Sequence, residues 1–315
     1  MSQAERRTSQ TDPFPVSDSG DGFHTVTLNH YEEFTQLMGE QRFLNHPEYI
    51  FRGHRDPSWP LLPSLYRRFD DQFSRSRRSV GTVALLEEKR DAGIRTARVL
   101  RSFLLGLRGT VWHDESHELL IDWFQNDAPI EPHINDLRNA GTNHRALWTA
   151  TINTWALGQH FGLFTPLLDW TESPLIAFYF AFEEADERIT GEENRVVFAL
   201  NRSLVQRRCS HKNFEHVPLD FVTPFSRNNA KLLAQQGLFT FSHVYQSVED
   251  WVREVFRGED LPVIIRFLIR NVRTIEAVRW LNRHGINDRT LFPDLQGIAG
   301  FTNRAFADPN LTYLA

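Results

Sequence analysis

The spacing of hydrophobic and polar positions changes several times along the chain, and each change predicts an element. Short runs rich in apolar, β-branched or aromatic residues, typical of strands, occur at 24–28, 48–53, 167–171, 195–200, 237–241 and 263–269. Apolar residues at steps of three and four, typical of helices, occur at 31–37, 79–156, 147–160, 273–284 and 292–301. Strands and helices are therefore both abundant, and we expect an α+β fold.

The densest informative stretch runs from residue 165 to residue 184. Its first part reads as a strand, and Ser173 followed by Pro174 is typical of a helix N-cap and first helical position. The next apolar run, over 195–200, is a further strand. Residues 167–200 are therefore predicted to form a strand–helix–strand unit.

The first 21 residues are polar and contain almost no large apolar side chains, so we predict a disordered tail over 1–21. No linker rich in Gly, Ser or Pro and no internal repeat divides the rest of the chain. We expect one domain over 22–315, with a helical insertion at about 79–156.

Composition limits where the protein can act. A 41% hydrophobic content with eight Trp and 25 Phe is enough for a large core, while no apolar run approaches the ~20 residues that span a bilayer. The N-terminus lacks the apolar stretch of a secretory signal. Cys209 is the only cysteine, which excludes an intrachain disulfide. We predict a soluble, cytoplasmic protein with no membrane contact.

Charge and motif content exclude several site classes. The formal charge of −5 gives no general attraction to nucleic acids. His113 and His117 are spaced for a metal but lack an identifiable third ligand, so no metal is expected. Cys209 and His211 are poorly spaced for a catalytic pair. The glycine fingerprints of P-loop and dinucleotide-binding folds are absent from the sequence.

Three segments resemble the FRG domain family. The first runs from Tyr49 to Arg67 and contains Phe51-Arg52-Gly53, and the second runs from Gln159 to Ala181 and contains Leu168-Asp169-Trp170-Thr171. The third combines Arg227, Gln236-Gly237-Leu238-Phe239 and a late run over 291–297. The resemblance implies a link to bacterial stress responses, toxins or anti-phage defence.

The order of these segments is also similar to the ADP-ribosyltransferase pattern. Arg52 takes the place of that pattern's early-strand arginine or histidine, and residues 169–171 take the place of its Ser-Thr-Ser triplet. Gln236 stands where the catalytic glutamate is expected. The resemblance implies a split β-sheet core and NAD as substrate, with Arg52, Asp169, Thr171 and Gln236 as catalytic residues.

The residue types fit parts of that chemistry, and each has a structural alternative. Arg52 can pair with a pyrophosphate, or instead with a buried carboxylate such as Asp169. Thr171 and Ser173 can hold ribose hydroxyls, or instead act as a turn residue and a helix cap.

Four further residues belong to the predicted nucleotide-binding set. Gly53 allows close approach of a ligand. Trp170 can stack on a ring or belong to the core. His54 and His160 can act as acid or base, or be structural.

Gln236 leaves the activity open, because an amide lacks the charge that stabilises an oxocarbenium-like centre. The first hypothesis is an NAD-dependent ADP-ribosyltransferase or NAD glycohydrolase, in which Asp169 or another carboxylate supplies that charge. The second is a non-catalytic module that binds a nucleotide or a partner in the same pocket. The third is a metal-dependent nuclease or hydrolase. Because the three motifs lie at strand–turn junctions, we predict that they meet in one pocket formed by strand ends, with Arg52 and Asp169 within a side chain's reach of each other.

Overall fold

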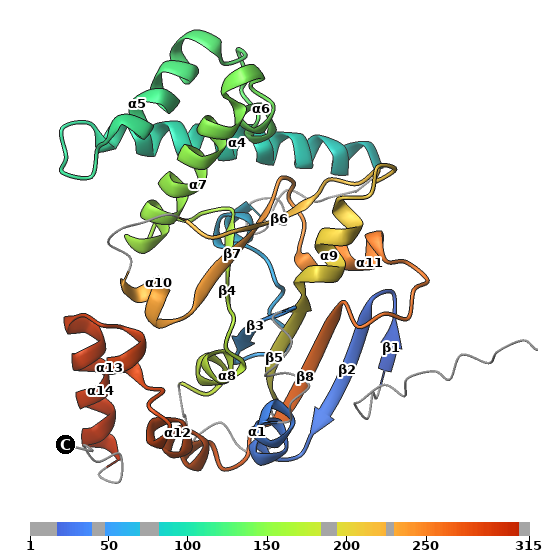
Figure 1. Ribbon diagram of the computed structural model, residues 1–315, viewed down its shortest axis with the longest axis vertical. Helices are drawn as coiled ribbons and strands as arrows, with labels where there is room; N and C mark the ends of the chain where they lie inside the picture. The colour runs from blue at the N-terminus through green and yellow to red at the C-terminus, as the bar shows by residue number, and fades with distance from the viewer. Residues whose placement is uncertain (1–17, 40–47, 70–81, 184–193, 225–229, 309–315) are drawn as a thin grey trace, which may run out of the picture.

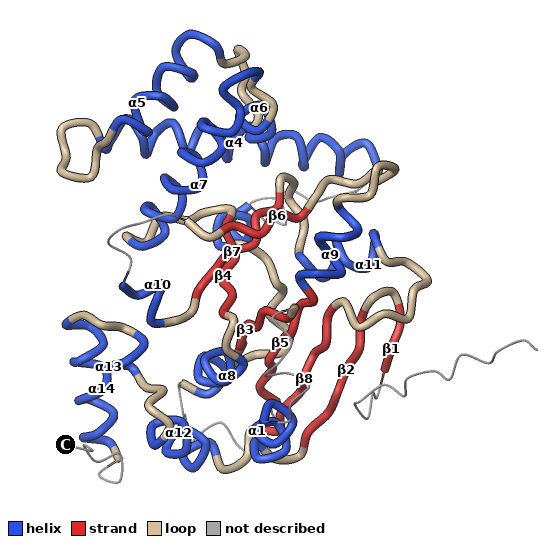
Figure 2. The backbone as a smooth tube through the Cα atoms, viewed as in Figure 1, coloured by secondary structure: helices blue, strands red, loops and turns tan. Residues whose placement is uncertain are grey.

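The computed structural model describes residues 18–39, 48–69, 82–183, 194–224 and 230–308. A single mixed sheet crosses the molecule in the strand order β1-β2-β8-β5-β3-β4-β7-β6 (Figures 1 and 2). The strands are β1 (Asp18–Gly20), β2 (Phe23–Leu28), β3 (Tyr49–His54), β4 (Leu167–Thr171), β5 (Asn194–Asn201), β6 (Leu219–Val222), β7 (Gly237–Ser242) and β8 (Ile264–Arg270).

Helices pack on both faces of this sheet and extend beyond one end of it (Figure 1). They are α1 (Tyr31–Gly39), α4 (Thr82–Leu107), α5 (Glu115–Asp122), α6 (Ile134–Arg138), α7 (His144–His160), α8 (Pro174–Phe182), α9 (Arg202–Cys209), α10 (Ala230–Ala234), α11 (Val248–Val255), α12 (Thr274–Arg283), α13 (Asp288–Leu291) and α14 (Leu295–Ala307). This mixed architecture confirms the α+β class. None of the described helices is long and apolar enough to cross a bilayer.

The predicted strand–helix–strand unit is present as β4–α8–β5, but its two strands are not neighbours. β3 lies between them and is antiparallel to both, so β4 and β5 run parallel to each other and α8 crosses over β3. Ser173 caps α8 and Pro174 begins it, as predicted. Every residue of α8 is apolar or aromatic, which is typical of a helix buried on all sides.

Gly53 allows this crossover. A Cβ atom at Gly53 would overlap the carbonyl oxygen of Ala177 and crowd the amide nitrogen of Ala181, both in the backbone of α8. The glycine of the Phe51-Arg52-Gly53 triplet therefore lets the helix lie directly on β3. The missing side chain of Gly53 therefore serves the packing of α8.

Alternate residues of β3 face two different cores. Phe51 packs with α8, α1 and α12 on one face, while Ile50 packs on the opposite face with residues of β5, α9 and α11. Arg52 and His54 follow Ile50 at two-residue steps and so belong to its face. A third core joins β4 and β7 to the helices over 82–160.

Residues 82–160 form a separate helical layer over the β6–β7 end of the sheet (Figure 2). This layer occupies most of the segment predicted as an insertion, 79–156, of which 79–81 lie outside the described residues. The helical hydrogen bonding that follows α5 ends at Asp127, before Pro129. α7 leads from the layer back to β4 and so connects it to the candidate site.

The predicted tail needs a correction at its end. Residues 1–17 lie outside the described residues, but Asp18–Gly20 form β1 and pair antiparallel with β2. The Asp21 carboxylate accepts a hydrogen bond of 2.6 Å from the amide of Gly258. Backbone pairing orders this segment, although its composition offers little apolar surface to bury.

The sheet is nearly divided between β3 and β4. In the described chain these strands share one residue pair, Phe51 and Thr171, whereas β3 pairs with β5 over six residues. On the His54 side of that pair, β3 has no ladder partner in β4, and side chains occupy the space between the two strands. The candidate site lies there.

Candidate functional site

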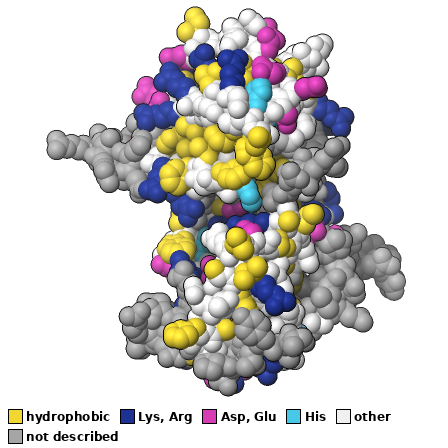
Figure 3. Space-filling view, turned by 90° about the vertical axis from the view of Figure 1, so that its left-hand side faces the viewer, with side chains coloured by type: hydrophobic (Ala, Val, Ile, Leu, Met, Phe, Trp, Pro, Cys, Tyr) yellow, Lys and Arg dark blue, Asp and Glu magenta, His cyan; other side chains and the backbone are white. Residues whose placement is uncertain are grey.

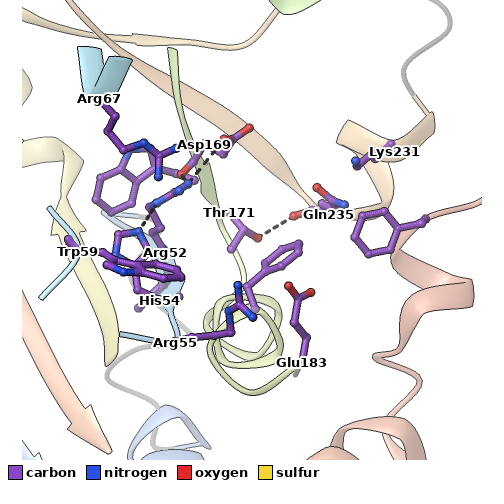
Figure 4. Close-up of a pocket in the computed structure, with 15 residues that line it drawn as sticks. Arg52, His54, Arg55, Trp59, Arg67, Asp169, Thr171, Glu183, Lys231 and Gln235 are labelled. Carbon is purple, nitrogen blue, oxygen red and sulfur yellow. Dashed lines mark hydrogen bonds and ion pairs between the residues drawn. The ribbon is translucent and has the colours of Figure 1, made fainter. Parts of the chain in front are cut away.

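A pocket of about 340 Å³ lies where β3 and β4 separate (Figure 4). Its walls come from β3, β4, the end of α8, α10 and the segment after α13. The lining residues are Phe51, Arg52, Gly53, His54, Arg55, Trp59, Arg67, Asp169, Trp170, Thr171, Phe180, Glu183, Lys231, Gln235 and Phe292. The first two sequence motifs therefore meet in one cavity. Of the third motif, Gln236 does not line the cavity and Arg227 lies outside the described residues.

The Arg52 guanidinium is held from two sides. Its Nε–H donates to Nε2 of His54 at 2.8 Å, and its Nη1 donates to the backbone oxygen of Asp169 at 2.7 Å. The Asp169 carboxylate lies 3.6 Å from the same Nη1. Within the described parts of the chain, Nη2 has no hydrogen-bond partner, so its N–H groups remain available to a ligand.

His54 is fixed as a neutral acceptor by its surroundings. Burial, together with the positive charge of Arg52, lowers the pKa of His54 to about 3. Its Nδ1 lies 3.2 Å from the backbone oxygen of Trp59, so Nδ1 carries the proton and Nε2 accepts from Arg52. His54 therefore orients the arginine and does not exchange protons near neutral pH.

The Asp169 side chain links the pocket to the helical layer. Gln159, in the last turn of α7, donates through Nε2 to Oδ1 of Asp169 at 2.6 Å. The Gln159 amide oxygen in turn accepts from the Thr165 hydroxyl. The amide is therefore engaged at both ends, and it orients the carboxylate that contacts Arg52.

Positive charge dominates the pocket. Arg52, Arg55, Arg67 and Lys231 line it against the two carboxylates of Asp169 and Glu183. Burial lowers the pKa of Arg52, and the positive charge of Arg67 lowers it further while Asp169 opposes both. An anion between the two guanidinium groups would relieve that repulsion.

Aromatic rings accompany the cations. Trp59 is 41% exposed, and the Arg55 guanidinium lies 5.4 Å from its ring centre. Elsewhere in the pocket wall the rings of Phe180 and Phe292 are nearly perpendicular at 6.3 Å, and the Lys231 ammonium lies 4.7 Å from the Phe292 ring. Figure 3 shows basic and acidic side chains meeting at the narrow middle of the face it presents, below a broad group of hydrophobic side chains.

Thr171 holds the backbone around the pocket together. Its hydroxyl donates to the carbonyl of Gln235 at 2.7 Å and accepts from the amide of Ser173 at 3.1 Å. The amide of Glu172 donates to the carbonyl of Gln236 at 3.0 Å. These bonds attach the end of β4 to the turn before β7 and engage the hydroxyl that the sequence assigned to a ribose.

The adjacent glutamines have different positions. Gln235 lines the pocket, and its side-chain amide donates to the Leu291 carbonyl at 3.2 Å. Gln236 is exposed, does not line the pocket and has a left-handed backbone with φ of 46°. At this turn before β7, Gln235 and not Gln236 lines the cavity, although Gln236 is the residue that the sequence pattern aligns with a catalytic glutamate.

Three other predicted ligand-binding residues have structural partners. Trp170 borders the pocket, but its indole is 3% exposed in the core and its N–H donates to the Thr240 hydroxyl at 2.9 Å. Ser173 caps α8 and does not line the pocket. His160, at the end of α7, stacks edge-on against Phe161 outside the lining.

Several lining residues were not predicted from the sequence. Trp59 and Arg67 lie within the first family segment, so their motif was a signal. Glu183 lies at the end of the dense stretch over 165–184 and Phe292 lies in the late run of the third family segment, but neither was singled out. Lys231 comes from a segment with no recognisable pattern. Among the described residues, no three His, Cys, Asp or Glu side chains gather as metal ligands would.

Comparison with known proteins finds a family model that matches part of the chain. The family model described as the FRG domain matches residues 47–189. The match contains β3, the helical layer, β4 and α8, while Gln235, Lys231 and Phe292 lie beyond it. No curated protein and no solved structure matches the chain.

Proposed function

This chain carries an FRG domain over residues 47–189, and we propose that its pocket binds NAD and cleaves the bond between nicotinamide and ribose. The activity would be that of an ADP-ribosyltransferase or an NAD glycohydrolase. The separation of β3 from β4 would then correspond to the split core of ADP-ribosyltransferases.

The orientation of Arg52 is the observation that carries the proposal. His54 and Asp169 fix three features of the guanidinium: its plane, its depth and the direction of Nη2. A planar fork with free N–H groups matches the paired oxygens of a diphosphate. A second arginine, Arg67, lies close enough to lower the pKa of Arg52. An arginine that only joined two strands would not need a second cation beside it, whereas a site for a diphosphate would use both.

The remaining pocket wall suits a flat, partly apolar ligand. Trp59 exposes an aromatic face, and Phe180 and Phe292 supply two further rings. Aromatic side chains of this kind pack against nucleobases and nicotinamide. The volume lies within the range of about 300–1,000 Å³ that is usual for small-molecule sites.

Calorimetric titration with NAD tests the binding step. Wild type should bind NAD, and Arg52→Ala should weaken binding by about 1.5–3 kcal/mol, the range for hydrogen bonds to charged groups. Arg101→Ala provides the control, because Arg101 is an exposed α4 residue outside the pocket. Equal affinities in all three proteins would contradict the proposal.

A measurement of nicotinamide release separates catalysis from sensing. The two glutamines at the start of β7 favour a second candidate, a module that binds the nucleotide without cleaving it. Binding with steady release of nicotinamide and ADP-ribose would support the enzyme. Binding without release would favour the module.

The biological setting is part of the proposal and rests on the family resemblance. FRG-type proteins suggest a role in bacterial stress, toxin action or anti-phage defence. Expression of wild type and of Arg52→Ala in a bacterial host, with cellular NAD measured, tests it. Loss of NAD or of growth with wild type alone would support a toxin-like effector.

A further inference from the structure

Glu183 is the pocket's uncommitted carboxylate. It follows the last residue of α8, is partly buried, and extends toward the space near Thr171 and Gln235 (Figure 4). Among the described residues, no side chain makes a hydrogen bond or ion pair with its carboxylate. Burial raises the pKa of Glu183, against the opposing charges of Arg304 and Arg55. A partly buried carboxyl group without a hydrogen-bond partner is costly and therefore points to a functional role.

The backbone of Glu183 is fixed although its carboxylate is not. Arg304 of α14 donates to the Glu183 carbonyl oxygen and pairs with Asp288 at 2.8 Å. The Arg304 guanidinium also lies 5.7 Å from the ring of Tyr179 in α8. The C-terminal helix thus holds the end of α8 in place, and the Glu183 side chain projects from a fixed point.

Asp169 cannot fill the same role as readily. Its Oδ1 accepts from Gln159 at 2.6 Å, and its Oδ2 lies 3.6 Å from Arg52. The negative charge of Asp169 is therefore partly neutralised by Arg52, the cation that we expect to bind phosphate. Gln235 lines the pocket as a neutral amide and brings no charge.

The excess of positive charge in the pocket favours a role for a carboxylate in the reaction. Four cations suit a diphosphate, but they oppose the positive charge that develops on the ribose as nicotinamide departs. A fixed negative group near that carbon would offset the repulsion in the transition state. Glu183 is the lining carboxylate whose charge is not already paired.

We propose that Glu183 is the catalytic carboxylate of this pocket, an assignment that rests on the proposed NAD-cleaving function. The C1′–N bond of NAD breaks and its electron pair goes to the nicotinamide nitrogen, so neutral nicotinamide leaves. The Glu183 carboxylate stabilises the oxocarbenium-like ribose. A water molecule, or the hydroxyl or amine of an acceptor, forms the new bond to C1′ and loses a proton to Glu183 and then to solvent.

The test compares Glu183→Gln with wild type. Glu183→Gln keeps the volume and removes the charge, so nicotinamide release should fall by about 100-fold or more while NAD affinity stays within about threefold. Glu183→Asp should retain an intermediate rate. Glu172→Gln is the control, since Glu172 is an exposed carboxylate outside the pocket lining, paired with Arg202 at 3.3 Å.

Chemical rescue separates catalysis from a structural role. Formate added to Glu183→Ala should restore part of the nicotinamide release, because a small carboxylate can occupy the vacated space. Melting temperatures of all variants should match that of wild type. Unchanged release in Glu183→Gln, beside active wild type, would overturn the assignment of Glu183 alone. Failure of wild type to bind NAD would overturn the proposed function itself.

Discussion

Arg52 and His54, two residues apart on β3, share a hydrogen bond of 2.8 Å in which the arginine is the donor. Because side chains at i and i+2 point to the same face of a strand, this geometry follows from their spacing. The histidine must be neutral to accept that bond. The Phe-Arg-Gly-His run thus contains a cation that lines the pocket and the residue that orients it.

Replacement of Arg52 by lysine should separate charge from geometry. Lys keeps the charge but lacks Nε–H and the planar fork, so it cannot donate to His54 and Asp169 while also offering two donors to a phosphate. We expect Arg52→Lys to recover only part of the NAD affinity that Arg52→Ala loses. Calorimetry at two salt concentrations provides the measurement. Full recovery by lysine would show that only charge matters.

The buried neutral ring of His54 should make the free energy of unfolding decrease as the pH falls below about 6.5. An unfolded histidine titrates near 6.5, whereas burial holds the pKa of His54 at about 3 in the folded protein. Between these values the unfolded state binds a proton that the folded state does not. Stability conferred by the neutral ring is therefore complete above pH 6.5 and falls by about 1.4 kcal/mol per pH unit as pH decreases toward 3.

Denaturant unfolding of wild type and His54→Gln at pH 6.5, 5.5 and 4.5 measures this effect. The free energy of unfolding of His54→Gln should fall less steeply with decreasing pH than that of wild type, by the contribution of about one proton. His117, His133 and His243, whose pKa values are also lowered by burial, contribute equally in both proteins. Parallel slopes would mean that His54 is already protonated in the native state.

Gly53→Ala should destabilise the fold strongly. The added methyl group would overlap the Ala177 carbonyl, and neither the strand nor the helix can shift without disturbing the buried faces of α8. We expect a loss of about 3 kcal/mol, at the upper end of overpacking costs. Gly106→Ala in α4 is the matched control, because nothing lies within 4 Å of its added carbon. It should be neutral or stabilising by up to about 1 kcal/mol. Similar melting temperatures for the two variants would contradict this packing.

Replacement by glutamate should have different effects at the two glutamines before β7. Gln235→Glu introduces a carboxylate into the cationic pocket, whereas Gln236→Glu introduces one at an exposed turn. We expect Gln235→Glu to change both NAD affinity and the rate of nicotinamide release by about tenfold, given the weight of one well-placed charge. Gln236→Glu should leave both unchanged. An effect of Gln236→Glu alone would restore the assignment made from sequence order.

Much of the fold could be predicted because its patterns are local. The short apolar and β-branched runs of β2, β3, β5 and β8 and the Ser173-Pro174 cap each depend on a few adjacent residues. α11 was not predicted, although Val248, Trp251, Val252 and Val255 have helical spacing and are all buried. β6 and α10 are short, at four and five residues, and offered too few positions to establish a period.

The site was harder to predict because it depends on long-range placement. The sequence indicated Arg52 and Asp169 through their motifs. The choice between Gln235 and Gln236 depends on one left-handed residue, which shifts the side chains by one position at the start of β7. Glu183, Lys231 and Phe292 enter the pocket only because α8, α10 and the segment after α13 converge there.

The position of β3 between β4 and β5 also affects how the chain acquires its structure. Tyr49 must find Asn201, which is 152 residues away in the sequence, and Phe51 must find Thr171, which is 120 residues away. Helices α4 to α7 rely on contacts between near neighbours and can form early, whereas the central sheet has to wait for these distant pairings. Assembly of the arginine pocket is therefore expected to be a late event in folding, later than formation of the helical layer.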